Sequence, residues 1–191
     1  MAKAKAVESL NSFHEKAMVA LKHANPLAVT LQAYLESTGY SSELAREAHN
    51  FCGMKAKDDW RGPTYEKLSD EDEGGDKMVA RKSPFRSYAT TEEFLEDLDR
   101  KIQKPNYAVC ASPEGHANFW VYFAGLVQGG WATDRAYFKK LVDVAVSQLR
   151  NLEPFKQGWR SKLHISFQWA HASGHLSEEH EQIIIAALKG V

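Results

Sequence analysis

Residues 32–56 read QAYLESTGYSSELAREAHNFCGMKA, and the interpretation of the whole chain starts from this stretch. Apolar residues near its start share one face at helical spacing: Leu27, Leu31, Tyr34 and Leu35. The spacing predicts a helix from residue 27 to residue 35, with Gly39 suited to end it as a C-cap. Ser41 is placed to cap a short helix that follows. Glu36 therefore falls at the C-terminal end of an apolar helix.

The position of Glu36 bears on its acid–base chemistry. The partial negative charge at a helix C-terminus and an apolar environment both disfavour the ionised form of a carboxyl group. A glutamic acid that stays protonated near neutral pH can give its proton to a leaving glycosidic oxygen. A single glutamate in the last turn of a helix is more often a plain surface residue, so this interpretation depends on the sequence around it.

An acidic β-hairpin is predicted further along the chain. Residues 60–63 indicate a loop that enters a strand at Thr64-Tyr65. The run SDEDEGGD at 69–76 is typical of a hairpin tip, because Gly74-Gly75 supply the positive φ angles of a tight turn. Lys77 to Arg81 are the predicted return strand. Acidic residues at such a tip are usually solvated, so composition alone does not single out one of them.

The remaining helices of the first 150 residues follow from the same spacing rule. They are expected at residues 4–24, 90–102, 115–128 and 134–150. Thr90 to Glu93 form a capping box for one of them, and Thr133 or Asp134 is placed to cap the last. We therefore expect residues 1–150 to form an α+β domain that is mainly α, with a small β-hairpin lobe.

The pattern changes after Leu152. Four apolar residues alternate with polar ones, which predicts a strand: Leu163, Ile165, Phe167 and Trp169. Ser177 then caps an apolar helix. A segment of about 40 residues is near the lower limit for independent folding. Residues 151–191 are therefore expected to be a C-terminal extension packed on the domain.

Composition excludes several function classes. The formal net charge of −1 argues against the broad basic surface of a nucleic-acid binder. Cys52 and Cys110 fit neither a metal motif nor a disulfide framework, and we expect two free buried thiols. A nucleophilic role for Cys52 is disfavoured, because a free cysteine is most often a buried, unreactive thiol. Four histidines near the C-terminus lack the spacing of a compact zinc site: His164, His171, His175 and His180.

Several short motifs, taken in order, resemble the glucosaminidase family of peptidoglycan hydrolases (glycoside hydrolase family 73), which includes flagellar peptidoglycan hydrolases and autolysins. The family pattern runs Gln-Ala-x-Leu-Glu-Ser-Gly-x-Gly, then Ser-x-Leu-Ala, then Asn-x-Phe-Gly-x-Lys, and residues 31–56 are similar to it. Further similar elements follow at Trp60-Arg61-Gly62, at Pro84–Tyr88 with Glu92-Glu93-Phe94, at Asn106-Tyr107-Ala108 and at Gly130–Tyr137. The resemblance covers residues 27–148.

The resemblance implies a lysozyme-like helical body with a β-hairpin lobe and a catalytic pair of acids. Glu36 takes the position of the general acid. Counting from Trp60, the family's hairpin acid falls on Glu71, although neighbouring acids at 70, 72 and 73 allow a slip of two positions. Glu66 on the incoming strand is an outside candidate.

The implied function is hydrolysis of the β-1,4 bond after N-acetylglucosamine in the glycan strand, which two carboxylates achieve without a cofactor. The second acid either activates water or is replaced by the substrate's own N-acetyl group, and the sequence leaves this choice open. Lytic transglycosylase activity with Glu36 alone, or a catalytically weak peptidoglycan-binding module, are the alternatives.

Four aromatic residues are candidates for substrate binding: Tyr107, Trp131, Tyr137 and Tyr122. Trp131 stands where the family usually has a tyrosine near the catalytic centre, so the hydroxyl hydrogen bond of that tyrosine is lost. Trp131 can still stack on a sugar ring. Tyr122 or Tyr137 is placed to compensate for the missing hydroxyl.

The implied partner is the peptidoglycan glycan strand, and we expect a monomer that acts on the bacterial cell wall. The sequence MAKAKAVESLNSF at the start lacks the apolar run of a secretory signal, and no segment approaches membrane-spanning length. Delivery is therefore expected through phage lysis by a bacteriolytic endolysin or virion enzyme, through specialised secretion, or as a trimmed secreted domain.

Overall fold

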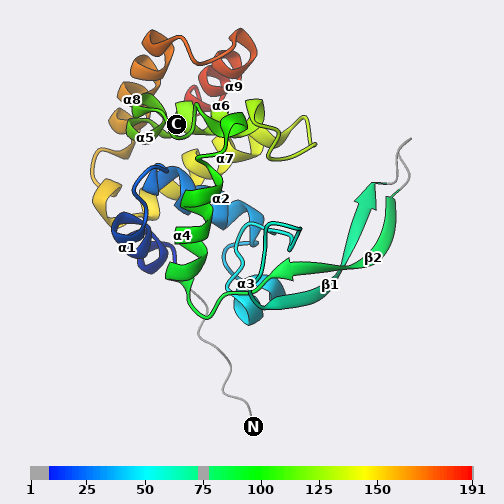
Figure 1. The fold of residues 1–191 in the computed structure, drawn as a ribbon. Helices are drawn as coiled ribbons and strands as arrows, with labels where there is room; N and C mark the ends of the chain where they lie inside the picture. Colours follow the sequence, from blue (N-terminus) through cyan, green and yellow to red (C-terminus); the bar gives the residue numbers. More distant parts are fainter. Residues whose placement is uncertain (1–8, 73–77, 191) are drawn as a thin grey trace.

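A computed structural model describes residues 9–72 and 78–190, with the side chains of 69–72, 78–81 and 154 left out. The helices, in order, are α1 (Leu10–Ala20), α2 (Pro26–Glu36), α3 (Glu43–Ala48), α4 (Thr91–Lys101), η1 (Pro105–Tyr107), α5 (Pro113–Ala117), α6 (Phe119–Gln128), α7 (Tyr137–Gln148), η2 (Leu149–Asn151), η3 (Glu153–Phe155), α8 (Trp159–Ser173) and α9 (Glu178–Leu188). The strands are β1 (Thr64–Asp72) and β2 (Met78–Arg86). Figure 1 shows a helical body from which the hairpin projects, so the predicted α+β, mainly α architecture is confirmed.

Helix α2 lies at the centre of the body. It packs against α1, α6 and α7, and every residue from Leu27 to Ala33 is buried. A helix that is apolar on all sides is stable only inside a core. The helix begins with Asn25 as its N-cap, whose side chain accepts a hydrogen bond from the N–H of Ala28 at 2.8 Å, and with Pro26 in the first turn. Its C-terminal end carries Glu36 out of the core.

The turn after α2 differs from the expected single glycine cap. Ser37 is the C-cap, and the left-handed conformation is shared by Thr38, Gly39 and Tyr40, with φ angles of 53°, 65° and 65°. Two non-glycine residues in this region are costly. The Tyr40 hydroxyl donates to the Thr30 carbonyl at 2.8 Å, and the ring stacks on a buried phenylalanine, which together hold the turn in place.

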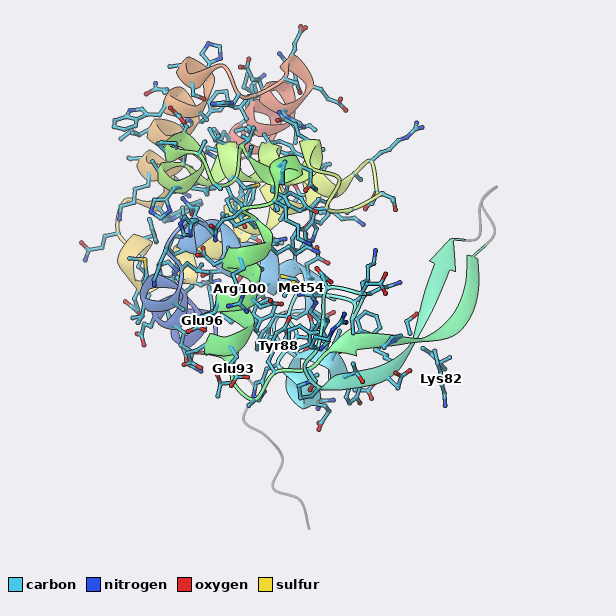
Figure 2. The ribbon with its side chains drawn as sticks, viewed as in Figure 1. Met54, Lys82, Tyr88, Glu93, Glu96 and Arg100 are labelled. Carbon is cyan, nitrogen blue, oxygen red and sulfur yellow. The ribbon has the colours of Figure 1, made fainter. Side chains whose placement is uncertain are left out.

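The hairpin is longer than expected. Strand β2 continues to Arg86, so β1 and β2 pair antiparallel from Thr64↔Arg86 to Asp72↔Met78. The segment after α3 extends the sheet at its base, since the N–H of Arg86 donates to the Met54 carbonyl at 2.9 Å. In Figure 2, Met54 lies between α4 and the hairpin. The hairpin is thus anchored in the body at one end.

Arg86 is the charged residue of this anchor. Its buried guanidinium donates to Asp97 on α4 at 2.8 Å and to Asp59 at 2.7 Å. Tyr88 donates its hydroxyl to the same Asp97 oxygen, also at 2.8 Å. The ring of Trp60 lies 5.0 Å from the guanidinium carbon. These contacts connect β2, the loop before β1 and α4.

The predicted strand in the C-terminal extension is wrong, because residues 159–173 form helix α8. Leu163 and Ala170 are buried, whereas Ile165 and Trp169 are 53% and 71% exposed. The buried residues Leu163 and Ala170 are seven positions apart, as helical spacing requires. The alternation seen in the sequence arises because Ile165 and Trp169 are apolar residues that face solvent. Helix α8 packs on α6 and α9 packs on α7, and their buried residues belong to the same hydrophobic core as the rest of the body.

Smaller differences concern helix ends. The expected helix at 115–128 is divided into α5 and α6 at Asn118, which caps α6. Helix α7 begins at Tyr137 with Ala136 as the N-cap, so neither Thr133 nor Asp134 caps it. Asp134 instead accepts a hydrogen bond from the N–H of Ala136 at 2.9 Å. In the described part of the chain, no helix combines the length and apolarity needed to cross a membrane.

The Arg86 anchor gives a stability prediction. Replacing Asp97 by alanine leaves the buried guanidinium and the Tyr88 hydroxyl short of a partner, so we expect a loss of about 3–5 kcal/mol in the free energy of unfolding. Asp143→Ala is the control, because it removes an aspartate from an exposed helix-surface ion pair with Lys139 and should cost less than about 1 kcal/mol. Urea denaturation measures both. If both variants lost the same free energy of unfolding, the pair between Arg86 and Asp97 would contribute no more to stability than an exposed ion pair.

Candidate active site

The end of α2 places the carboxylate of Glu36 against two aromatic side chains. Tyr137, at the start of α7, donates its hydroxyl to Glu36 Oε1 at 2.6 Å. The side chain of Trp131, from the loop before α7, is close enough to the same carboxylate to lower its pKa. Glu36 keeps access to solvent along its side chain. The group is therefore held from one side and reachable from the other.

This environment changes the acidity of Glu36. Burial raises the pKa of Glu36 above its ordinary value, because the charged form loses hydration. The hydrogen bonds from Tyr137 and Trp131 and the charge of Lys140 oppose that rise without cancelling it. Glu36 is thus the kind of carboxyl group that holds its proton to a higher pH than a glutamate of ordinary pKa does.

Tyr137 is a positioning residue in this arrangement. It is buried, and its hydroxyl also receives a long 3.5 Å contact from the Gln32 side-chain amide. Burial and the neighbouring Glu36 charge raise the pKa of Tyr137 well above its ordinary value, so the hydroxyl stays a donor. Tyr137 was predicted to bind substrate or to replace the missing hydroxyl. The structure places it on Glu36, where it supplies a hydroxyl donor.

Trp131 acts on Glu36 in a way that the sequence did not indicate. Replacement of the family tyrosine was expected to remove a hydroxyl hydrogen bond, and the Trp131 side chain still lowers the pKa of Glu36. The ring lies 5.7 Å from the ring of Tyr107, and the Lys101 ammonium lies 5.1 Å from it. No pattern in the sequence predicts which edge of an indole meets a carboxylate.

A cavity of about 400 Å³ adjoins this group. Tyr107 and Trp131, two of the predicted substrate-binding residues, both line it. Cys52 and Met54 line it as well. This volume is within the usual range of ligand sites, roughly 300–1,000 Å³.

Tyr122 is a correction. It is fully buried within α6, and its hydroxyl has no hydrogen-bond partner among the described residues. It therefore cannot contact a glycan or support Glu36 directly. The run of buried residues from Phe119 to Leu126 is continuous in the sequence, and that continuous apolar run is the signal of a core helix.

Of the candidate acids on the hairpin, only Glu66 has a side chain within the described part of the chain. Glu71 lies in β1 opposite Val79, and its side chain is outside the described part, as are those of Asp70 and Asp72. Glu73 lies outside the described residues altogether. Glu66 is exposed on β1 opposite Pro84. The assignment of the second acid to Glu71 stays a prediction.

The cysteines are free and buried, as the sequence predicts. Burial and the nearby Glu36 charge raise the pKa of Cys52 well above its ordinary value, and burial raises the pKa of Cys110 to about 12. Such thiols are poor nucleophiles. Among residues 9–72 and 78–190, no three His, Cys, Asp or Glu side chains gather as a metal site would require.

Comparison with known proteins identifies the family. Residues 15–148 match the Glucosaminidase family, described as mannosyl-glycoprotein endo-beta-N-acetylglucosaminidase. The chain belongs to the glucosaminidase family. It is a glycoside hydrolase by that membership, and the resemblance inferred from its motifs is confirmed. Peptidoglycan hydrolase FlgJ of Escherichia coli strain K12 is 31% identical over 132 residues, which are 65% of this chain and 40% of FlgJ. The chain thus spans about 40% of the length of this curated relative.

Solved structures support the same assignment. The truncated glycoside hydrolase domain of Salmonella typhimurium FlgJ is 27% identical, with a TM-score of 0.58 over 73% of this glucosaminidase and 94% of that chain. The catalytic domain of the autolysin Auto from Listeria monocytogenes is also 27% identical, with a TM-score of 0.58 over 72% of this glucosaminidase and 81% of that chain.

The raised pKa of Glu36 gives a prediction that needs no substrate. The folded pKa lies above the unfolded value of 4.5, so the contribution of Glu36 to stability is fully present below that value and is lost as the pH rises through the folded pKa. Glu36→Gln stays neutral at every pH. We therefore expect the stability of Glu36→Gln relative to wild type to be higher at pH ~7.5 than at pH ~4, as measured by urea denaturation.

Glu96→Gln is the matched control for this experiment, because Glu96 is exposed on α4, on the side of that helix away from Met54 (Figure 2). The same pH dependence in both variants would mean that it does not come from the environment of Glu36.

Proposed function

We propose that this glucosaminidase hydrolyses the β-1,4 glycosidic bond after N-acetylglucosamine in peptidoglycan, with Glu36 as the general acid. The observation that carries the proposal is the carboxyl group of Glu36, held by Tyr137 and Trp131 with a raised pKa beside an open cavity. The names of two relatives, a peptidoglycan hydrolase and an autolysin, support the bacterial cell wall as the place of action. Delivery by phage lysis, by specialised secretion or as a trimmed secreted domain belongs to the same proposal.

The chemistry follows from one protonated carboxyl group. Glu36 gives its proton to the glycosidic oxygen while the bond between that oxygen and the anomeric carbon breaks and its electron pair goes to the oxygen. The sugar ring passes through an oxocarbenium-like state, which water attacks. Tyr137 and Trp131 then stabilise the carboxylate that Glu36 becomes, since donors aimed at a developing charge lower the energy of the transition state.

The second acid in this proposal is Glu71, which activates the attacking water. Two inverting carboxyl groups stand roughly 6.5–9.5 Å apart to admit that water, and a hairpin acid opposite a helix acid suits such a spacing. The hairpin is rooted in the body through Arg86. Support for Glu71 comes from its position in the family pattern and from its place in β1.

Turnover of purified peptidoglycan tests the proposal. We expect Glu36→Gln to lower kcat by about a hundredfold to ten-thousandfold, because it removes the transferable proton. Glu71→Gln should also lower kcat strongly, whereas Glu66→Gln, the outside candidate on the same strand, should not, and the reverse result would move the second acid to Glu66. Mass spectrometry of the products should show N-acetylglucosamine at the new reducing ends.

Other outcomes point to the alternatives. Anhydro-sugar products together with an active Glu71→Gln variant would indicate a lytic transglycosylase that needs Glu36 alone. Full activity of Glu71→Gln with ordinary reducing ends would indicate assistance by the N-acetyl group of the substrate. Binding of glycan without turnover by the wild-type protein would indicate a binding module.

The contact between Tyr137 and Glu36 predicts a change in the pH profile. The hydrogen bond from Tyr137 lowers the pKa of Glu36, so Tyr137→Phe raises that pKa further. Because the general acid must be protonated, we expect the alkaline limb of kcat/KM to move to higher pH in Tyr137→Phe. Tyr122→Phe is the control, since Tyr122 is buried in α6 and its hydroxyl has no partner among the described residues. A shift toward lower pH in Tyr137→Phe would contradict the assignment of Glu36.

A further inference from the structure

The cavity beside Glu36 is strongly basic. Five basic side chains and one acidic side chain line it: Lys55, Lys57, Arg86, Lys101, Lys104 and Asp59. The whole chain has a formal net charge of −1, so this excess of positive charge is local. It is gathered from the segment before β1, from β2 and from α4 with the loop that follows it. Cations concentrated in one concave site favour an anionic ligand.

The one carboxylate that lines the cavity, Asp59, is already paired with two of the cations. Asp59 accepts from Lys104 at 2.9 Å and from Arg86 at 2.7 Å. The hydrogen bond from Lys104, with a smaller contribution from Arg86, lowers the pKa of Asp59 to about 2. Arg86 is further neutralised by Asp97 from behind the cavity. These three residues therefore balance one another and leave Asp59 no capacity for the other cations.

Three of the five cations are not used by Asp59. The Lys55 ammonium lies 6.0 Å from the ring of Phe85, and the other two are Lys57 and Lys101. Within the part of the chain that the structure describes, neither has a carboxylate in ion-pair range. Lys101 is half-buried, and burial lowers its pKa, as do the charges of Arg86 and Lys104. An ammonium group that is partly dehydrated among like charges gains most when an anion approaches.

The cavity adjoins the proposed catalytic group. Trp131 belongs to both, because it lines the cavity and acts on the pKa of Glu36, while the Lys101 ammonium lies 5.1 Å from its ring. Cys52 lines the cavity, and the charges of Glu36 and Lys101 both act on its thiol. A substrate held at Glu36 therefore has the basic cavity within reach of its substituents.

We propose that this cavity is a carboxylate-binding subsite that holds the peptide carried by the glycan strand, with Lys57 and Lys101 as its ligands. The inference rests on the proposed function. In peptidoglycan the N-acetylated sugar rings are uncharged, and the lactyl group of the muramic acid residue carries a short peptide with several carboxylates. Those carboxylates are the nearest anions to the bond being cleaved. The cavity thus makes the enzyme selective for strands that keep their peptides.

The test compares two substrates. Peptide-bearing glycan strands and strands stripped by an amidase, which leaves the free lactyl carboxylate, are given to wild type, Lys57→Gln and Lys57→Gln/Lys101→Gln. We expect the ratio of kcat/KM for peptide-bearing over stripped strands to fall on the order of tenfold in the double variant, mainly through KM, and less in the single variant. The preference of the wild type should also weaken as salt is added.

Lys156→Gln is the control, because Lys156 is an exposed lysine of the C-terminal extension with a single acidic partner. An unchanged ratio of kcat/KM overturns the proposal. Disturbed packing of Trp131 or misfolding produces that result, because each lowers kcat/KM on both substrates together. A larger loss of kcat/KM on the stripped strands than on the peptide-bearing strands overturns it as well, because the cavity would then bind the lactyl carboxylate and not the peptide.

Failure of the proposed function is distinguishable from failure of this inference. A wild type that cleaves neither substrate refutes the function, and calorimetry then tests the cavity directly with soluble muramyl disaccharides with and without the peptide. Tighter binding of the peptide-bearing form, lost in Lys57→Gln/Lys101→Gln, supports the subsite, and equal binding of the two forms overturns it.

Discussion

The buried ion pair between Arg86 and Asp97 is the contact on which the rest of the site depends. A guanidinium without a partner is too costly to bury, so the end of β2 is held where α4 presents a carboxylate. The same arginine also reaches Asp59 in the loop before β1. One side chain thus fixes the base of the hairpin, the loop beside it and the helix that carries Lys101. The base of the hairpin and the basic cavity therefore both depend on Arg86.

The sequence predicted the parts of this structure that local pattern controls. Helix α2 and the capping box at Thr90 follow from short-range spacing, and Thr90 accepts from the N–H of Glu93 as expected. The extension shows where such reasoning fails. An alternation from Leu163 to Trp169 suits a strand, yet it also arises when a helix buries one stripe and exposes other apolar residues. Only the surface of α6, against which α8 packs, decides between the two, and that surface comes from a distant part of the chain.

The candidate site also contains one residue that a local motif indicated and others that only tertiary packing brings close to it. Glu36 was found because its neighbours in sequence form a recognisable motif around a helix end. The donors that reach it come from the loop and helix about 100 residues later, so their orientation depends on how α2 and α7 pack. The basic cavity had no signal at all, because Lys57 and Lys101 belong to no common motif. Charge clusters assembled from separate segments are visible only after folding.

Trp131 lies near two groups with opposite electrostatic requirements, the proposed general acid Glu36 and the proposed subsite at Lys101. A general acid must keep its proton, and positive charge close to Glu36 would favour proton loss. A carboxylate subsite, in contrast, needs positive charge. The Trp131 side chain lies near both groups, since the Lys101 ammonium is 5.1 Å from its ring and the same side chain acts on the pKa of Glu36. Cation–π attraction is strongest with tryptophan, so Trp131 holds a lysine at the edge of the proposed subsite more firmly than a tyrosine would.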